Sequence, residues 1–300
     1  MKKLVFDIGA SAIKYALMNN NAEIYEKGKE ITPHDNLDNF LSVLESIYNK
    51  YKNQINGIAI SLPGTIDSLK GQIYAPGGLT YNENINLVDK IHQFTDLPVS
   101  LENDGKSAAL AELWKGNLED SQDGIVIVVG SGLGGGIVKD GKLLKGQHLF
   151  AGEFSYVYQG EGQTFMENAW AVRGSTTALI GSVALKKKMD FNELNGYEIF
   201  KMIHDGDKDA NESLQEVAQS LAKGIYNLQC ILDPKKILIG GGISQQPILI
   251  EKIKEELDKI YSFIPFDIPR AQIETCCFYN DSNLIGALYN YLNMYKESEE

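Results

Sequence analysis

Cysteine is scarce in this 300-residue sequence, and the three cysteines stand at positions 230, 276 and 277. None of them forms a C-x-x-C pair, so the spacings of zinc ribbons and dithiol redox motifs are missing. Disulfides persist in oxidising compartments, whereas isolated thiols are typical of a reducing one. We therefore expect core thiols in a cytoplasmic protein.

Long apolar runs and an excess of positive charge are missing as well. The apolar run after Met1-Lys2-Lys3 ends at Asp7, and no segment approaches the roughly 20 apolar residues of a membrane helix. The formal net charge of −12 has the wrong sign for unspecific binding to nucleic acid or anionic lipid. We expect neither as a partner. The 43% of hydrophobic residues suffices for one large or two ordinary globular domains.

What the chain does contain is an internal duplication. Each half opens with three short extended runs, and a glycine-containing turn joins the first run to the second. These runs cover residues 3–6, 12–18, 23–29, 125–129, 136–138 and a last one from 143 onward. Asp140-Gly141 is a favoured hairpin turn within the second set. The two sets predict two β-meanders about 120 residues apart.

Helices and further strands follow each meander. Apolar spacing predicts helices over 37–51, 107–114, 214–232 and 283–292, and strands over 57–62, 99–102 and 236–239. A helix cap is expected at Asp35 or Asn36. The repeated pattern indicates an α/β fold of duplicated domains with an inter-domain cleft. We expect one lobe over 1–118, completed by the C-terminal helix at 281–300, and a second over 119–280.

The densest glycine cluster is Gly130-Ser131-Gly132-Leu133-Gly134-Gly135-Gly136. It contains a G-x-G-x-x-G, but a dinucleotide fingerprint needs a helix after the glycines, and here a strand is predicted. A hairpin alone needs fewer glycines, and residues without a Cβ let backbone N–H groups approach an anion. We interpret the cluster as a phosphate loop, with a flexible hairpin as the alternative. Its expected phosphate contacts are Gly130, Ser131, Gly132, Gly134 and Gly135.

Two other turns carry candidate nucleotide contacts. In Asp7-Ile8-Gly9-Ala10-Ser11, a buried carboxylate at a strand end needs a partner, and Mg²⁺ held through water beside phosphates is one candidate. A turn-capping aspartate is the alternative. Lys14 either contacts phosphate or points to solvent. Gly240-Gly241-Gly242 lies between a strand and a helix, where a ribose or base could lie against the backbone, although a tight connection also needs glycine.

Asp104 is the most consequential acid, because it follows a predicted strand at the sheet edge where ligands bind in open α/β folds. Kinases that phosphorylate a hydroxyl place a carboxylate there to accept its proton. An N-cap for the following helix is the alternative. Neighbouring Glu102 and Asn103 could grip a polyol. Glu153 could accept hydrogen bonds from sugar hydroxyls, although it also fits a plain surface residue.

Taken in their order along the chain, the motifs resemble those of the ROK family of sugar kinases, which has the actin-like, ribonuclease-H-like fold. Residues 7–14 are similar to the family's D-x-G-x-T/S-x-x-K phosphate motif, with Asp7, Gly9, Ser11 and Lys14. Residues 102–109 are similar to its E-N-D-x-x-x-A-A stretch, and 130–136 to its second phosphate loop. Residues 233–244 resemble the adenosine-side motif, with Gly241 and Gly242, and 280–288 resemble its closing helix.

The resemblance spans nearly the whole chain and implies its chemistry. A member of this family would use ATP and Mg²⁺ to phosphorylate a sugar hydroxyl, with Asp104 as the base and Asp7 at the metal. It would be a homodimer. The sugar contacts that the resemblance implies are Gly64, Gly78, Thr80, Asn103, Asp104, Glu153 and Glu167.

Two departures from the family pattern bear on the substrate. The family usually has G-E-I-G-H, whose histidine contacts the sugar and ligates a structural zinc, whereas Gly152-Glu153-Phe154-Ser155-Tyr156 ends in tyrosine. The usual cysteine cluster is missing from 158–170, so we expect no structural zinc. The zinc-less members that this version resembles include β-glucoside kinases, which phosphorylate the 6-hydroxyl of the non-reducing glucose in cellobiose and similar glucosides.

Three alternatives to a β-glucoside kinase remain. A monosaccharide kinase for glucose or N-acetylmannosamine is the nearest alternative. Some members of the family are sugar-binding repressors with an added helix-turn-helix, which we do not expect here because the first strand begins at Lys3. A sugar sensor without catalysis is the third interpretation.

Overall fold

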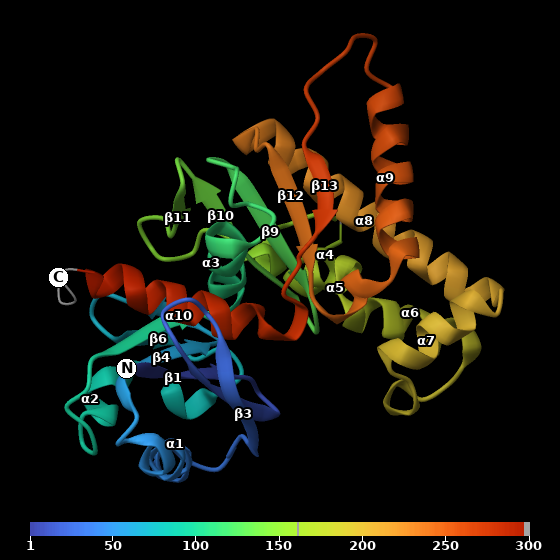
Figure 1. Ribbon diagram of the computed structural model, residues 1–300. Coiled ribbons are helices and arrows are strands. Elements are labelled where there is room, and N and C mark those ends of the chain that lie inside the picture. The colour runs from blue at the N-terminus through green and yellow to red at the C-terminus, as the bar shows by residue number, and fades with distance from the viewer. Residues whose placement is uncertain (161, 297–300) are drawn as a thin grey trace. The chain divides into compact units, whose positions relative to one another are not determined.

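The computed structural model describes residues 1–160 and 162–296 of the chain (Figure 1). The chain divides into two compact units. Unit 1 comprises Met1–Gly116, Leu143–Ala151 and Asp281–Glu300, and unit 2 comprises Asn117–Lys142 and Gly152–Asn280. Leu143–Ala151 therefore belongs to unit 1, although the segments on either side of it in the sequence belong to unit 2.

Unit 1 is built on a five-stranded sheet of order β3-β2-β1-β4-β8. Its strands are β1 (Lys2–Ile8), β2 (Ala12–Met18), β3 (Ile24–Ile31), β4 (Ile55–Leu62) and β8 (Val99–Asn103). The first three form an antiparallel meander, and β4 and β8 extend the sheet in parallel. The carboxyl ends of β1, β4 and β8 therefore meet at one edge of the sheet, where the candidate residues of this unit stand.

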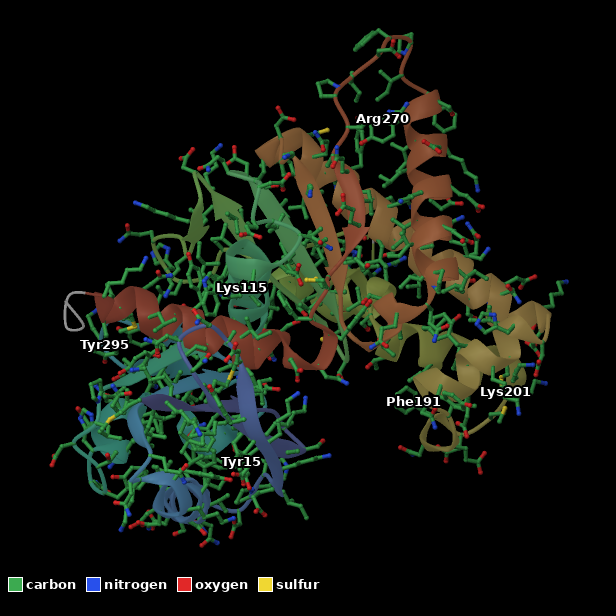
Figure 2. The ribbon with its side chains drawn as sticks, viewed as in Figure 1. Tyr15, Lys115, Phe191, Lys201, Arg270 and Tyr295 are labelled. Atoms are coloured by element: carbon green, nitrogen blue, oxygen red, sulfur yellow. The ribbon has the colours of Figure 1, made fainter. Side chains whose placement is uncertain are left out.

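Helices cover both faces of this sheet (Figure 1). Helix α1 (Leu37–Tyr51) begins after Asn36, whose side chain accepts a hydrogen bond from the Asn39 N–H, as the sequence predicts. Its buried residues join the strands in one hydrophobic core. The Tyr15 ring of β2 lies in this core between Phe6 and Tyr51 (Figure 2).

The opposite face carries α10 (Ser282–Met294) and α3 (Asp104–Lys115). The two helices pack closely against each other. A Cβ added at Gly286 of α10 would lie only 1.7 Å from the Ser107 carbonyl oxygen of α3. Asn290 also donates a hydrogen bond of 3.1 Å to the Leu101 carbonyl. This hydrogen bond links α10 to β8, the strand that ends just before Asp104.

A small antiparallel sheet extends unit 1 beyond β4. It consists of β5 (Thr65–Asp67), β6 (Gln72–Ala75) and β7 (Ile85–Asn86), and it is accompanied by η1 (Thr80–Asn82) and α2 (Leu87–Ile91). The glycines predicted to face a sugar lie beside these elements, Gly64 just before β5 and Gly78 between β6 and η1.

Unit 2 repeats the topology of unit 1 with the strand order β11-β10-β9-β12-β13. The strands are β9 (Gly124–Val129), β10 (Leu133–Lys139), β11 (Lys142–Leu144), β12 (Lys236–Gly240) and β13 (Gln272–Thr275). β9 pairs antiparallel with β10 and parallel with β12, as β1 does with β2 and β4. The predicted duplication and the actin-like fold are confirmed.

In the sequence, most of the remaining elements of unit 2 lie between β11 and β13. They are η2 (Phe154–Tyr156), α4 (Phe165–Asn168), α5 (Ala171–Gly174), α6 (Thr176–Lys187), η3 (Phe191–Glu193), α7 (Gly196–His204), α8 (Lys208–Leu232), η4 (Gly242–Gln245), α9 (Pro247–Ser262) and η5 (Tyr279–Asp281). Beyond α9, Arg270 returns to the helix, where it pairs with Asp258 and lies over the Tyr261 ring (Figure 2). Across residues 1–160 and 162–296, no helix is long and apolar enough to span a membrane.

Of the boundaries that differ from those predicted, two bear on the candidate site. Helix α3 begins at Asp104, three residues before the predicted start, because the Asn103 side chain caps it by accepting the Lys106 N–H. Strand β10 begins at Leu133, so that Gly134, Gly135 and Gly136 pair with β9 instead of forming part of the turn. The turn itself is therefore limited to Gly130, Ser131 and Gly132.

Candidate active site

The first phosphate turn brings together Asp7 and Lys14. The two residues are direct partners in the β1–β2 register, and the Lys14 Nζ lies 3.3 Å from Asp7 Oδ2. Asp7 is buried, and its second oxygen accepts a hydrogen bond of 2.9 Å from the Asn283 side chain. The sequence singled out the motif around Asn283 but gave that residue no role, because its contact with Asp7 bridges the two ends of the chain.

The backbone of this turn is fixed by short-range bonds. The Gly9 N–H donates to the Ala12 carbonyl at 2.9 Å, and the buried Thr32 hydroxyl donates to the Gly9 carbonyl at 2.7 Å. Ser11 remains exposed. Gly78 lies against the turn, since a Cβ at that position would be 3.7 Å from the Ala10 Cβ. One predicted sugar residue thus stands beside the predicted phosphate residues.

Asp104 is the first residue of α3 and is partly exposed. Its Oδ1 accepts the Gly105 N–H at 2.8 Å. The alternative role of helix N-cap falls to Asn103, whose Oδ1 accepts the Lys106 N–H at 3.0 Å. Asp104 therefore occupies the helix N-terminus, where a carboxylate is electrostatically favoured, and it retains access to solvent.

Glu102 takes part in an internal ion pair, which differs from the predicted grip on a polyol. The side chain is fully buried, and its Oε2 lies 2.6 Å from the Lys145 Nζ. The Ser68 hydroxyl donates to the same oxygen at 3.1 Å, and the Asn103 N–H donates to Oε1 at 2.9 Å. Sequence reasoning missed this role because Lys145 comes from a distant part of the chain.

Two of the predicted sugar residues of unit 1, Asn103 and Gly64, meet at the end of β8. The Asn103 side chain donates a hydrogen bond of 3.0 Å to the Gly64 carbonyl. Gly64 has a φ of 123°, and a Cβ there would lie 2.2 Å from the Ala75 carbonyl oxygen, so only glycine fits this turn. Thr80 begins η1 and is exposed.

Unit 2 contains a cavity of about 470 Å³ at its two glycine clusters. Its size is within the range of small-ligand sites. It is lined by Val129, Gly130, Ser131, Thr176, Thr177, Ile180, Gly196, Tyr197, Phe200, Gly242, Ile243 and Gln246. Backbone of the phosphate loop therefore lies at the same cavity as two aromatic rings, which suits a ligand with both an anionic part and a flat apolar part.

Direct packing joins these two glycine clusters. Gly241 has a φ of 90°, and a Cβ there would lie 2.2 Å from the Val129 carbonyl oxygen. The Thr176 N–H at the start of α6 donates to the Gly130 carbonyl at 2.9 Å. The sequence predicted Gly130, Ser131 and Gly242 for this site. It missed the contributions of α6 and α7, whose residues carry no recognisable motif.

The segment with Glu153 is fastened to the strand that follows the phosphate loop. Glu153 immediately precedes η2, in which the Ser155 hydroxyl accepts the Leu133 N–H at 2.8 Å and donates to the Leu133 carbonyl at 3.0 Å. A Cβ at Gly152 would lie 3.0 Å from the Gly135 carbonyl oxygen. The predicted sugar residue Glu153 is thus held close to β10.

Glu167 serves as a helix cap in this structure. It forms a capping box with Thr164 at the start of α4, and its carboxylate accepts the Gln163 and Thr164 N–H groups at 2.7 and 3.1 Å. These backbone hydrogen bonds, that from Thr164 foremost, lower the pKa of Glu167. Its predicted contact with sugar would have to coexist with this cap.

Residues 158–160 and 162–170 are held by the buried Asn168. The Asn168 side chain accepts the Gly162 N–H at 2.7 Å and donates to the Tyr158 hydroxyl at 2.8 Å and the Thr164 carbonyl at 2.6 Å. Within residues 1–160 and 162–296, no three His, Cys, Asp or Glu side chains are placed to hold a metal ion together. Hydrogen bonds to one amide therefore organise these residues.

An exposed aromatic pair lies next to these elements. The Tyr156 and Phe165 rings stack with centroids 6.0 Å apart and planes 26° apart. Their exposed fractions are 55% and 45%, which is unusual for large apolar side chains in contact. The pair offers a flat surface three residues beyond Glu153.

Comparisons with known proteins show what this chain is similar to. A model of the ROK family matches residues 4–293. The beta-glucoside kinase of Listeria monocytogenes is 32% identical over 295 residues, which cover 97% of this chain and 98% of that relative. A solved structure from Listeria monocytogenes, described as a candidate N-acetylmannosamine kinase, has a TM-score of 0.90 at 30% identity and covers 98% of this chain and 99% of its own. A ROK family protein from Streptococcus pneumoniae TIGR4, solved with sucrose, has a TM-score of 0.88 at 28% identity, covering 99% and 100%.

Proposed function

This chain belongs to the ROK family and is a carbohydrate kinase, and we propose that it phosphorylates the 6-hydroxyl of the non-reducing glucose of a β-glucoside such as cellobiose. The observation that carries the substrate is the nearly full-length likeness to a beta-glucoside kinase at 32% identity. We assign the base, the first phosphate turn and most of the sugar contacts to unit 1, and we assign the second phosphate loop, the adenosine side and the sugar contacts Glu153 and Glu167 to unit 2.

The proposed reaction makes one bond and breaks one. The sugar O6 attacks the γ-phosphorus of ATP, the bond to the β–γ bridging oxygen breaks, and ADP leaves. Asp104 accepts the proton of the 6-hydroxyl as the new O–P bond forms. Its place as the part-exposed first residue of α3, with the cap supplied by Asn103, supports this role.

The phosphates of ATP are assigned to two turns. The loop at Gly130, Ser131 and Gly132, with Gly134 and Gly135 behind it, offers backbone groups, and Lys14 offers a cation. The aromatic rings of Tyr197 and Phe200, which line the cavity, suit the base, and we assign the ribose to Gly242 of the same lining and to its neighbour Gly241.

Asp7 is the residue that would hold Mg²⁺. It presents buried carboxylate oxygens at the phosphate turn, and Mg²⁺ prefers oxygen ligands while usually taking only one or two carboxylates beside substrate phosphates. When bound, the ion would neutralise negative charge on the phosphates. Within this arrangement, Lys14 and Asn283 orient the carboxylate.

The sugar is assigned to Gly64, Gly78, Thr80, Asn103, Glu153 and Glu167. What favours a glucoside over a free monosaccharide is the exposed Tyr156–Phe165 pair, which could stack against a second ring or an aglycone. The monosaccharide kinase remains the second candidate, because a structural relative is described as a candidate N-acetylmannosamine kinase.

A release assay for ADP with four sugars tests the proposal. Cellobiose, glucose, N-acetylmannosamine and fructose are each supplied with ATP and Mg²⁺. We expect the highest kcat/KM with cellobiose. Preference for glucose or N-acetylmannosamine would favour the monosaccharide kinase, and sugar binding without any ADP release would indicate a sensor.

We further propose a cytoplasmic homodimer. The three free cysteines and the family resemblance support this assignment. Light scattering on the purified protein should give twice the chain mass of 33.2 kDa. A mass equal to one chain would contradict the dimer.

A further inference from the structure

The phosphoryl-transfer reaction proposed above gives no role to the ion pair between Glu102 and Lys145. Both oxygens of the Glu102 carboxylate are engaged, one by the Asn103 N–H and the other by Ser68 and Lys145. The Lys145 Nζ also donates to the Ser68 hydroxyl at 2.7 Å. A charged group taken fully out of water needs such a compensating partner, and Lys145 supplies the opposite charge.

The acidic end of this pair stands next to the catalytic residue. Glu102 and Asn103 are the last residues of β8, and Asp104 follows at once. Asn103 is itself held at three points: its N–H by Glu102, its Oδ1 by the Lys106 N–H and its Nδ2 by the Gly64 carbonyl. A displacement of the Glu102 carboxylate would therefore move Asn103 and, with it, the start of α3, where Asp104 lies.

Lys145, the basic residue of the pair, belongs to a loop that backbone hydrogen bonds close. The Lys145 carbonyl accepts the Ala151 N–H at 3.2 Å, and the Gly146 carbonyl accepts the Leu149 N–H at 3.3 Å. Leu149 has a φ of 61°, which few residues other than glycine adopt without tertiary support. The loop ends at Ala151, one residue before Gly152 and two before Glu153 in the sequence.

We infer that Lys145 is a positioning residue for phosphoryl transfer, which ties the loop leading to Glu153 to the strand that ends at Asp104. The inference rests on the proposed function, in which Glu153 binds the sugar and Asp104 is the base. Lys145 itself does not touch the reacting atoms. It acts through Glu102 on one side and through its own loop on the other.

Three variants test this role by steady-state kinetics with cellobiose and ATP. Lys145→Met removes the charge but keeps the length of the side chain, Lys145→Arg keeps the charge, and Lys142→Met changes an exposed lysine of the neighbouring strand β11 as the matched control. For Lys145→Met we expect the KM for cellobiose to rise and kcat to fall by about tenfold each, with the KM for ATP within about twofold of wild type. Lys145→Arg should restore most of both, and Lys142→Met should match wild type.

A purely structural role would give a different result. Lys145→Met would then melt at a lower temperature while the folded protein kept the wild-type KM for cellobiose and the wild-type kcat. That outcome, or equal increases in the KM values for both substrates, would overturn the inference.

A second variant covers the case in which Lys145→Met fails to fold. Glu102→Gln combined with Lys145→Met removes both charges, so no unpaired ion is left inside the protein. We expect this double variant to fold and still to show the raised KM for cellobiose. Wild-type kinetics in the double variant would refute the positioning role.

Failure of the proposed function gives a separate signal. If wild-type protein releases no ADP with cellobiose, the same variants are compared by calorimetry for their dissociation constants with glucose. Weaker binding by about tenfold in Lys145→Met, reversed in Lys145→Arg, would support the positioning role without any turnover, and unchanged binding would refute it.

Discussion

The two units place a turn at the same point of the same topology, yet they fill it with different chemistry. In unit 1 the turn between β1 and β2 carries side chains with opposite charges, since Asp7 and Lys14 are partners in the register. In unit 2 the turn between β9 and β10 is flanked by glycines, and Gly134 pairs with Val128. The duplicated fold thus provides one turn that acts through side chains and another that acts through its backbone.

This difference separates the mutations that should harm each unit. At these two turns, deleting a side chain should be most damaging in unit 1, whereas adding one should be most damaging in unit 2. The predictions below test that contrast, beginning with the largest expected effect.

The largest effect is expected from Asp104→Ala. Removing a general base costs about 10²- to 10⁴-fold in rate, so kcat should fall by that amount. The dissociation constant for cellobiose, measured by calorimetry, should stay within about threefold of wild type because binding does not need the proton acceptor. Turnover close to wild type would remove Asp104 as the base.

The next effect is expected from Asp7→Asn. The amide keeps the size of the side chain but loses the charge that would hold Mg²⁺, so kcat should fall roughly a hundredfold and the Mg²⁺ requirement should rise. A titration of kcat against Mg²⁺ concentration measures both. Lys14→Met serves for comparison: it keeps the carboxylate, so it should raise the KM for ATP and shift the Mg²⁺ midpoint less than Asp7→Asn does. An unchanged midpoint in Asp7→Asn would contradict the assignment.

Gly241→Ala tests the backbone side of the comparison. The new Cβ would lie 2.2 Å from the Val129 carbonyl oxygen at a φ of 90°, so we expect about 1–3 kcal/mol of destabilisation and a KM for ATP raised about tenfold. Gly206→Ala is the matched control, because Gly206 has a φ of 81° but no described atom within 4 Å of the added Cβ. Equal effects of the two variants on the KM for ATP would contradict a nucleotide site at Gly241.

A smaller effect is expected from Tyr156→Ala. A pair of stacked rings contributes about 0.5–1.5 kcal/mol, so the ratio of kcat/KM for cellobiose to that for glucose should fall about threefold to tenfold. Tyr156→Phe keeps the ring and should keep the ratio. A ratio that does not change in Tyr156→Ala would show that the pair does not contact the second ring.

The smallest effect concerns Glu167 and pH. Backbone hydrogen bonds lower its pKa from the ordinary value of 4.5, so its contribution to stability is present above that value and is lost as the pH falls through the folded-state pKa. Glu167→Gln keeps an acceptor at the cap but does not titrate. Its melting temperature should therefore fall less than that of wild type between about pH 5 and pH 3. Equal losses would mean that the cap contributes nothing.

The elements with strong local signals were predictable from the sequence. Helix α1 and strand β2 have the predicted bounds, because apolar spacing and the Asn36 cap act over a few residues. The start of α3 was not, since the competition between Asn103 and Asp104 for the cap depends on the packing of β8 against Gly64. Local patterns cannot express that contact.

The residues of the candidate site likewise divide into those with a local signal in the sequence and those without one. The glycine clusters and Asp104 stand out because their chemistry is visible in single residues. Asn283 at Asp7 and Lys145 at Glu102 could not be found in this way, because each meets a partner that is distant in the sequence. The aromatic wall at Tyr197 and Phe200 was also missed, since aromatic residues on a helix usually indicate core.

The product made from ATP and cellobiose by the purified protein tests the central claim most directly. Phosphorus and carbon NMR should show one phosphomonoester on the 6-hydroxyl of the non-reducing glucose, formed in equal amount with ADP. Inorganic phosphate with ADP, or unaltered cellobiose after full incubation, would contradict the account.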